Sequence, residues 1–346
     1  MAWPMLGVGG VAVIGSSLSP RPVFRFVEPA LWLVLALLPL ILSDWQAGQL
    51  AIFFCYGILA MSLGFIWGQA GLLCFGQAVF FGLGAYAMSL TTLGMWPGQD
   101  GEGGSFFGLA MAVLLPALFA NLLGRFLFHG KGLRGAYLGI VTLAVGVVAE
   151  RLAVNWNYIG GMNGLMNVPP LRFAWGEEVA EIWDGIPLYY IGLGAAFVVY
   201  LLIQGLLATR FGLVLRALRE NEDRAVYLGF DAASYKVWVF TLGAAIAGLA
   251  GGLFVTQFNF ASPALIGFAL STEVLIWVAL GGRGFLLAAF LGAIIVRFLE
   301  DQLSEGLLQL WPLLLGIGFI VVVVAFPRGL IGELLAHLRS ANSKAP

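Results

Sequence analysis

The run QLAIFFCYGILAMSLGFIWG, from Gln49 to Gly68, decides the fold of this chain. A helix needs about 20 residues to cross a hydrocarbon core about 30 Å thick, and the run reaches that length without a charged residue. It therefore predicts a helix that spans a membrane.

The composition of the whole chain agrees with this prediction. The 346 residues are 61% hydrophobic and only 10% charged, with a mean hydropathy of +0.97. A soluble domain is roughly half apolar and a quarter charged, so this chain has too few polar residues to cover its surface in water. The net charge of -1 argues against a nucleic-acid partner, and Cys55 and Cys74 lie in apolar runs as expected of core residues.

Apolar runs between helix breakers predict an all-α integral membrane protein with about ten transmembrane helices. A single transmembrane domain is expected over residues 29–332, between cytoplasmic tails at 1–28 and 333–346. Residues 1–20 lack lysine and arginine, which favours a tail there over a cleaved signal peptide or an eleventh span. The first and eighth spans are short, and the sequence leaves open whether they cross fully. The expected spans are 29–43, 49–68, 71–93, 106–128, 135–155, 187–208, 236–258, 268–281, 284–303 and 307–326.

The basic residues predict the orientation. With a cytoplasmic N-terminus, ten spans place all but three of the 17 lysines and arginines on the inner side. The exceptions, Arg151, Arg172 and Arg297, fall at or beyond the outer helix ends and have acidic neighbours. We therefore expect both termini in the cytoplasm, and a location in a bacterial inner membrane.

Polar residues at membrane depth narrow the function. The chain has no HExxH motif and no paired intramembrane aspartates, so we expect neither catalytic residues nor a metal site. An ion-coupled carrier buries several ionisable groups along its route, but only Glu273 lies well inside an expected span. The energy for directed transport is therefore expected to come from a partner.

One inner segment is unusually polar, TRFGLVLRALRENEDRAVYLGFDAASY from Thr209 to Tyr235. Its middle, about residues 215–229, has the pattern of a short helix that ends at Gly229. A solvated loop is the simpler alternative, because a charge run is usually a solvated surface.

The end of that segment, DRAVYLG, resembles the E-A-A-x-x-x-G signature of the coupling helix in permeases of ATP-binding cassette (ABC) importers. Ala225 and Gly229 match, whereas Asp223 replaces glutamate and Arg224 replaces the first alanine. Further stretches resemble, in the same order, the permeases that import branched-chain amino acids, amides and urea. They are GLLCFGQAVFFGLGAYAM (71–88), RGAYLGIVTLAVG (134–146) with GGMNGL (160–165), RFGLVLRALRENE (210–222), LGFDAASYKVWVFTLGAAIAGLAGGLF (228–254) and FPRGLIG (326–332).

This resemblance implies a type II-like ABC importer permease that works by alternating access. It implies a second homologous permease subunit, two cytoplasmic ATPase subunits that carry ATP and Mg²⁺, and an external solute-binding protein as partners. The chain itself would bind no cofactor. The residues implied in coupling to the ATPase are Glu220, Asn221, Glu222, Asp223, Arg224, Ala225 and Gly229.

The substrate prediction rests on STEVLIWVALGGRG, Ser271 to Gly284, which is similar to the urea-type subunit of the family. The scarcity of charge at membrane depth also favours a small neutral solute, so urea or a short amide is expected. A branched-chain amino acid importer of the same family is one alternative. An ATP-independent channel or facilitator for a neutral solute is the other.

Four residues are candidates for the pathway. Gln77 lies in a glycine-interrupted segment, where it either lines a cavity or fastens helices together. For Thr142, a bond to its own helix backbone is the favoured interpretation. Glu273 needs a partner, and an ion pair with Arg297 or Arg151 is slightly favoured over a substrate contact. Asn163 belongs to an outer segment that is expected to form a short helix over the entrance and to receive the binding protein.

Overall fold

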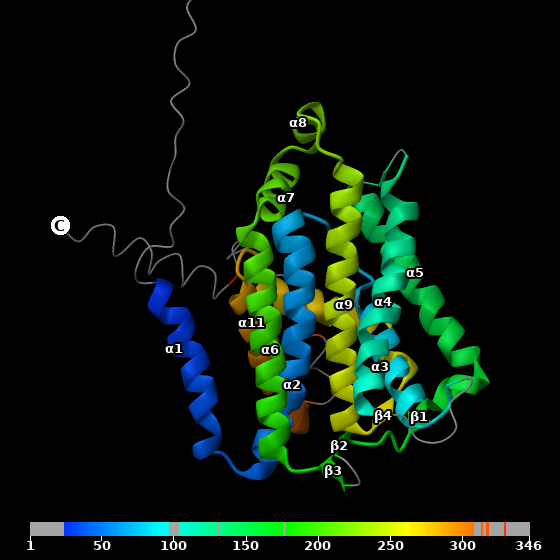
Figure 1. Cartoon of the computed structure of the whole chain (residues 1–346), viewed down its shortest axis with the longest axis vertical. Coiled ribbons are helices and arrows are strands. Elements are labelled where there is room, and N and C mark those ends of the chain that lie inside the picture. The colour runs from blue at the N-terminus through cyan, green and yellow to red at the C-terminus, as the bar shows by residue number, and fades with distance from the viewer. Residues whose placement is uncertain are drawn as a thin grey trace, which may run out of the picture.

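The computed structural model describes residues 24–96, 104–130, 132–133, 135–175 and 178–307, and the isolated positions 313, 316, 317 and 329. Long helices run side by side between two ends of the molecule (Figure 1). They are α1 (Phe24–Leu37), α2 (Asp44–Leu63), α3 (Gln77–Thr92), α4 (Ser105–Phe128), α5 (Ala136–Asn155), α6 (Gly185–Ala208), α9 (Ala232–Phe258), α10 (Phe268–Gly281) and α11 (Leu286–Leu307).

Two helices form the core of the bundle. α2 continues into a π-helical turn, η2 (Gly64–Gln69), and the two form one span. Of the most apolar 18-residue stretch of this span 78% is buried, and the corresponding share for α9 is 72%. The corresponding windows of α4, α5 and α6 are 22%, 28% and 39% buried, so their apolar surfaces face outwards. α9 packs against α3 and α4, and α2 packs against α6, α11 and α9. The inner helices are therefore apolar all round, as expected inside a membrane bundle.

The prediction of ten crossings is not confirmed. Among the described residues, five helices are long and apolar enough to span a membrane: α2 with η2, α4, α5, α6 and α9. α10 and α11 pass that test only as a pair, with a bend of 118° between them, so they form one broken span or a re-entrant loop rather than the two crossings expected. Most of the expected span 307–326 lies outside the described residues, as does the tail 333–346.

Two further expected spans have bounds that differ from the prediction. The first, 29–43, is a short helix that already begins at Phe24, inside the expected tail 1–28, and continues into a 3-10 turn, η1 (Leu38–Leu40). The third, 71–93, is helical only from Gln77, because residues 71–76 are non-helical backbone. Gly71 adopts a φ of +73°, which residues other than glycine rarely adopt, and it follows the end of the preceding helix, α2 with η2.

The packing of α3, α9 and α4 depends on close backbone contact. A Cβ atom added to Gly84 of α3 would lie 2.1 Å from the carbonyl oxygen of Gly248 in α9. A Cβ on Gly248 would lie 2.2 Å from the carbonyl oxygen of Ala112 in α4. Glycine is thus the only residue that fits at either position, and its small size lets these membrane helices approach closely.

The end opposite the short helices α7 (Arg210–Glu220) and α8 (Glu222–Tyr227) carries two small antiparallel sheets, which the all-α prediction missed. β1 (Leu165–Met166) pairs with β4 (Phe260–Ala261), and β2 (Leu171–Trp175) pairs with β3 (Glu178–Ile182). Three short 3-10 turns accompany them: η3 (Asn157–Ile159), η4 (Gly161–Asn163) and η5 (Pro263–Leu265). The short helix expected over the entrance is therefore a β-hairpin.

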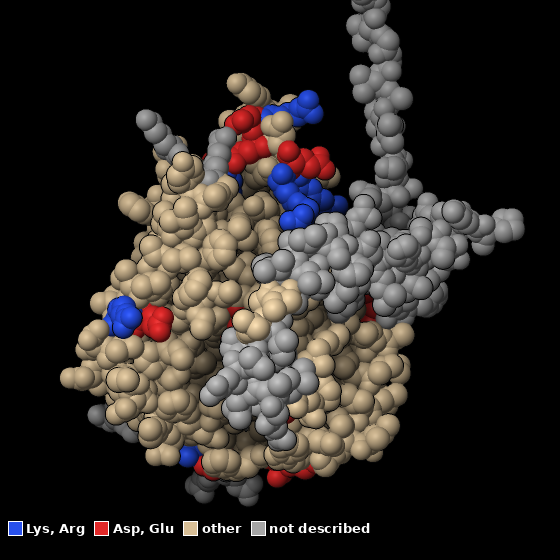
Figure 2. Space-filling view, turned by 180° about the vertical axis from the view of Figure 1, so that it is seen from behind, with Lys and Arg blue, Asp and Glu red and all other residues tan. Residues whose placement is uncertain are grey.

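Charged side chains gather at the two ends of the molecule and are sparse on the wall between them (Figure 2). The segments 129–135 and 209–231, both predicted on the inner side, lie at the same end in Figure 1, and the two sheets lie at the other. This arrangement fits a multi-pass membrane protein whose wall faces lipid.

Candidate functional site

The polar inner segment folds into two short helices, α7 (Arg210–Glu220) and α8 (Glu222–Tyr227), at one end of the bundle (Figure 1). Asn221 separates them because its backbone is extended, with a φ of -156°. Its side-chain oxygen accepts a hydrogen bond of 2.9 Å from the backbone N–H of Arg224, which caps α8. Asn221 therefore ends one helix and starts the next.

Gly229 stops α8, as the sequence predicts. It has a φ of +90°, and its N–H donates to the carbonyl of Val226 at 2.9 Å. The N–H of Phe230 donates to the carbonyl of Ala225 at 3.2 Å, which completes a Schellman motif. A short helix with a defined end is present here, so the alternative of a simple solvated loop is wrong.

The inward face of this segment is fastened to the transmembrane helices. Ala225 is 2% exposed and lies in an apolar cluster with Val214, Leu218 and Ala232, the first residue of α9. Ala225 therefore packs against α7 and the start of α9 and is not part of an outward surface. This corrects the prediction that groups Ala225 with the residues that meet a partner.

Two basic residues add polar connections to the core helices. Lys236 of α9 is 7% exposed, and its ammonium lies 2.5 Å from the carboxylate of Glu222. Arg219 of α7 donates a hydrogen bond to the carbonyl of Gly68 at the end of η2. These contacts connect α7 and α8 to both buried helices, α9 and α2.

The C-terminal end of α8 exposes apolar side chains although it lies at a charged end of the molecule. Tyr227 is 91% exposed and Leu228 is 72% exposed, and Val226 and Phe230 are partly exposed beside them. We call these four residues the α8 tip. The residues predicted from the sequence to contact a partner are mostly the charged ones of this segment, and they do not include the α8 tip. The sequence contains the apolar run from Val226 to Leu228, but which of these side chains face outwards depends on the tertiary contact of Ala225, which the run itself does not indicate.

A cavity of about 610 Å³ lies behind α8, between the α4–α5 connection and the start of α9. Phe128, Tyr137, Glu222 and Lys236 contribute to its wall. Asp231, which also lines it, accepts hydrogen bonds from the Ser234 backbone and hydroxyl, and these lower the pKa of its carboxyl. This carboxylate stays ionised at neutral pH and caps α9.

The ion pair behind α8 leads to a prediction. Lys236→Met is expected to lower the free energy of unfolding by about 1 to 3 kcal/mol, because the partly buried carboxylate of Glu222 loses its ion pair with Lys236. Thermal unfolding in detergent measures the loss. Lys236→Arg is the matched control, since it keeps the charge and should stay close to wild type. Equal stability of Lys236→Met and Lys236→Arg would show that this ion pair does not stabilise the fold.

The pathway candidate Gln77 is fully buried at the first turn of α3. Its amide nitrogen donates to the hydroxyl of Ser62 at 2.8 Å and to the carbonyl of Gly243 at 3.5 Å. Its amide oxygen has no partner among the described residues. Gln77 thus joins α2, α3 and α9, and it retains one free acceptor.

Thr142 lies beside the same helix break. Its hydroxyl donates to the carbonyls of Leu138 and Gly139 at 3.0 Å, so the expected bond to its own helix is present. The same hydroxyl accepts from the backbone N–H of Phe75 at 3.1 Å. On α10, the hydroxyl of Ser271 accepts from the N–H of Ala78. These two side chains satisfy backbone groups that the broken segment exposes within the bundle.

The candidate Glu273 forms the ion pair expected with Arg297, at 3.5 Å. Arg297 also pairs with Glu300 at 2.6 Å and lies over the rings of Tyr56 and Trp277, at 4.2 and 5.1 Å from their centroids. Its position is near the middle of α11, although the sequence placed it at an outer helix end. The bundle thus contains a charged cluster, of which the sequence predicted the pair of Glu273 with Arg297 but neither the contact with Glu300 nor the place within α11.

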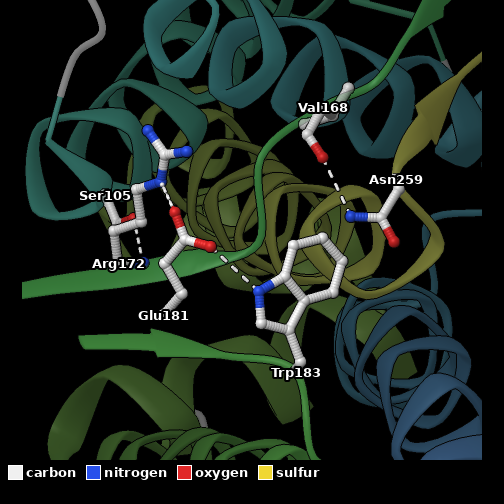
Figure 3. A network of polar contacts seen from close by, with 6 residues as sticks. All are labelled: Ser105, Val168, Arg172, Glu181, Trp183 and Asn259. Atoms are coloured by element: carbon white, nitrogen blue, oxygen red, sulfur yellow. Dashed lines mark hydrogen bonds and ion pairs between the residues drawn. The ribbon is translucent and has the colours of Figure 1, made fainter. Parts of the chain in front are cut away.

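Asn163 is exposed in η4, at the end of the molecule that carries the two sheets. The polar contacts that hold this end are made by other residues (Figure 3). Arg172 pairs with Glu181 at 2.9 Å across the β2–β3 hairpin, and its backbone N–H donates to Ser105 of α4. Trp183 donates to Glu181, and Asn259 donates to the carbonyl of Val168. The structure therefore does not bring the four pathway candidates into one site.

Comparison with known proteins identifies the family. The model of the branched-chain amino acid transport system / permease component family matches residues 47–323, which cover the bundle from α2 through α11. The chain belongs to this family. No solved structure matches the chain with significance.

Curated relatives of this permease are similar over most of its length. It is 32% identical to the high-affinity branched-chain amino acid transport system permease protein LivM of Escherichia coli, over 84% of this chain and 71% of the relative. The Salmonella typhimurium protein of the same name gives the same values. A probable branched-chain amino acid transport permease protein LivM of Methanocaldococcus jannaschii is 28% identical, over 80% of this chain and 90% of the relative.

Proposed function

We propose that this permease is the transmembrane subunit of an ATP-driven importer of branched-chain or similar apolar amino acids. The observation that carries the proposal is the family match over residues 47–323, together with relatives that are named for branched-chain amino acid transport. The proposal replaces the expectation of urea, which the named relatives do not support. It also disfavours an autonomous facilitator, because the α8 tip presents an apolar surface for a partner.

The geometry of α7 and α8 supports a mechanical role in this function. The α8 tip is the part that would seat in a groove of a cytoplasmic ATPase, since apolar side chains on a short helix make such contacts. Ala225, Lys236 and Arg219 link the segment to α9 and α2. Closure of two ATPase subunits on ATP and Mg²⁺ would therefore move the buried helices and change the side to which the pathway opens.

The other partners follow from the same class of importer. We expect a second, homologous permease, a solute-binding protein at the end with the β2–β3 hairpin, and a bacterial inner membrane around the assembly. This chain would hydrolyse nothing itself. Among its described residues, no group of three or more histidine, cysteine, aspartate or glutamate residues is arranged to hold a metal ion.

Uptake into proteoliposomes tests the proposal. The complete importer, with its own binding protein and ATPases, is expected to accumulate leucine when ATP is supplied and not when ATP is replaced by ADP. Urea and acetamide, offered at the same concentration, should not accumulate. Thermal-shift measurements on the binding protein are expected to show stabilisation by leucine and none by urea or acetamide. A response to urea alone, or uptake without the ATPases, would contradict the proposal.

A further inference from the structure

The charged cluster on α11 surrounds an aromatic centre at Tyr56. The ring of Tyr56 lies 5.3 Å from that of Trp277 and 5.2 Å from that of Phe254, between centroids, and 6.1 Å from that of Phe81. Arg297 covers both Tyr56 and Trp277. Four helices, α2, α3, α9 and α10, thus contribute one apolar wall, and α11 adds the charge.

Three buried polar atoms next to this wall have no hydrogen-bond partner among the described residues. Two are donors, the indole N–H of Trp277 and the Nε–H of Arg297, and one is an acceptor, the amide oxygen of Gln257. Trp277 is fully buried. Gln257 lies one turn after Phe254 on the same face of α9, and its amide nitrogen donates to the sulfur of Cys55 in α2. A buried polar atom without a partner is costly, and such atoms mark places where a ligand supplies the bond.

The charges of the cluster add to this pattern. Arg297 forms ion pairs with both Glu273 and Glu300. The side chains of Arg297, Glu273 and Glu300 are 18%, 29% and 22% exposed, so the group is only partly buried. Two carboxylates against one guanidinium leave an excess of negative charge for a cationic group. Ionisable side chains within membrane helices are expensive and typically mark a substrate route.

We infer that Tyr56, Trp277 and Arg297 form a binding site on the transport pathway that holds an apolar α-amino acid as a zwitterion. This inference rests on the proposed function. The substrate carboxylate accepts from Trp277 and Arg297, the ammonium binds Glu273 and the amide oxygen of Gln257, and the side chain packs on the aromatic wall. A small amide such as urea also offers a carbonyl to the two donors, but it brings neither the opposite charges nor an apolar group for the rings.

The experiment compares transport with ATP hydrolysis in the reconstituted importer. Trp277→Phe keeps a ring and removes the N–H, and Arg297→Lys keeps the charge that Glu300 and Glu273 need while removing Nε–H. Each is expected to reduce leucine uptake at least tenfold, whereas ATP hydrolysis stimulated by the loaded binding protein stays within twofold of wild type. Trp156→Phe and Arg151→Lys, which change exposed residues outside the cluster, are matched controls and should transport normally.

The outcomes separate this inference from the proposed function. Normal leucine uptake by Trp277→Phe and Arg297→Lys would contradict the inferred binding site but would not contradict the proposed importer function. A parallel loss of uptake and ATP hydrolysis would contradict the binding site as well, since that pattern indicates a structural defect. If the wild-type importer moves urea and no amino acid, the proposed function itself is wrong. Gln257→Met, which removes the acceptor, replaces either variant that fails to fold and is expected to lower uptake in the same selective way.

Discussion

Leu228→Asp is expected to abolish ATP-dependent uptake while the permease remains folded and inserted. Leu228 is 72% exposed and makes no part of the buried cluster around Ala225, so the substitution leaves the fold untouched. In the importer the same side chain would enter an apolar groove, where a carboxylate costs at least about 2 kcal/mol, or roughly a 30-fold loss in affinity for the ATPase.

Binding-protein-stimulated ATP hydrolysis and uptake measure this effect, and thermal unfolding reports on the fold. Leu228→Met is the matched control, because it keeps an apolar side chain of similar volume and should behave like wild type. If Leu228→Asp assembled with the ATPase and transported at the wild-type rate, the α8 tip would not be the coupling surface.

Gly248→Leu is expected to prevent the permease from folding. A Cβ atom at this position lies 2.2 Å from the carbonyl oxygen of Ala112 and 2.6 Å from the ring of Pro116, so α4 and α9 would have to separate. Overpacking against side chains costs about 1 to 3 kcal/mol, and a collision with backbone exceeds that range. Size-exclusion profiles and thermal unfolding in detergent should show the loss of the monodisperse protein.

Gly194→Leu is the control for this experiment. Gly194 lies on the exposed face of α6, and a Cβ atom there meets nothing within 4 Å. The two variants add the same side chain to a glycine within a membrane helix and differ only in what surrounds it. Equal thermal stability of the two would contradict the close packing of α9 against α4.

Local signals in the sequence predicted the end of α8 well. A charge run in an otherwise apolar chain, with a glycine after it, indicated a short helix that ends at Gly229, and the structure has that end. The direction in which each residue faces was not predictable in the same way. Ala225 points inward because Val214 and Leu218 of another helix meet it, and a tertiary contact of this kind leaves no periodic signature in a helix of six residues.

The number of spans was the weakest prediction, because hydropathy measures apolar length and not helical continuity. The segment 71–93 has the length of a crossing, yet its first residues are not helical. The segments 268–281 and 284–303 have the composition of two crossings, yet the backbone turns by 118° between them. The charge argument for urea failed for a related reason. It treated Arg297 as a residue at a helix end, whereas the structure places it on the rings of Tyr56 and Trp277.

The break before α3 also constrains how the chain is made. α3 has 16 residues, which is about 24 Å of helix and less than the roughly 30 Å of a hydrocarbon core, and it starts with a glutamine. The backbone groups at its start are satisfied by Thr142 and Ser271, which leave the ribosome after it does. The start of α3 therefore depends on segments that are synthesised after it, because these hydrogen bonds form only once α5 and α10 have joined the bundle.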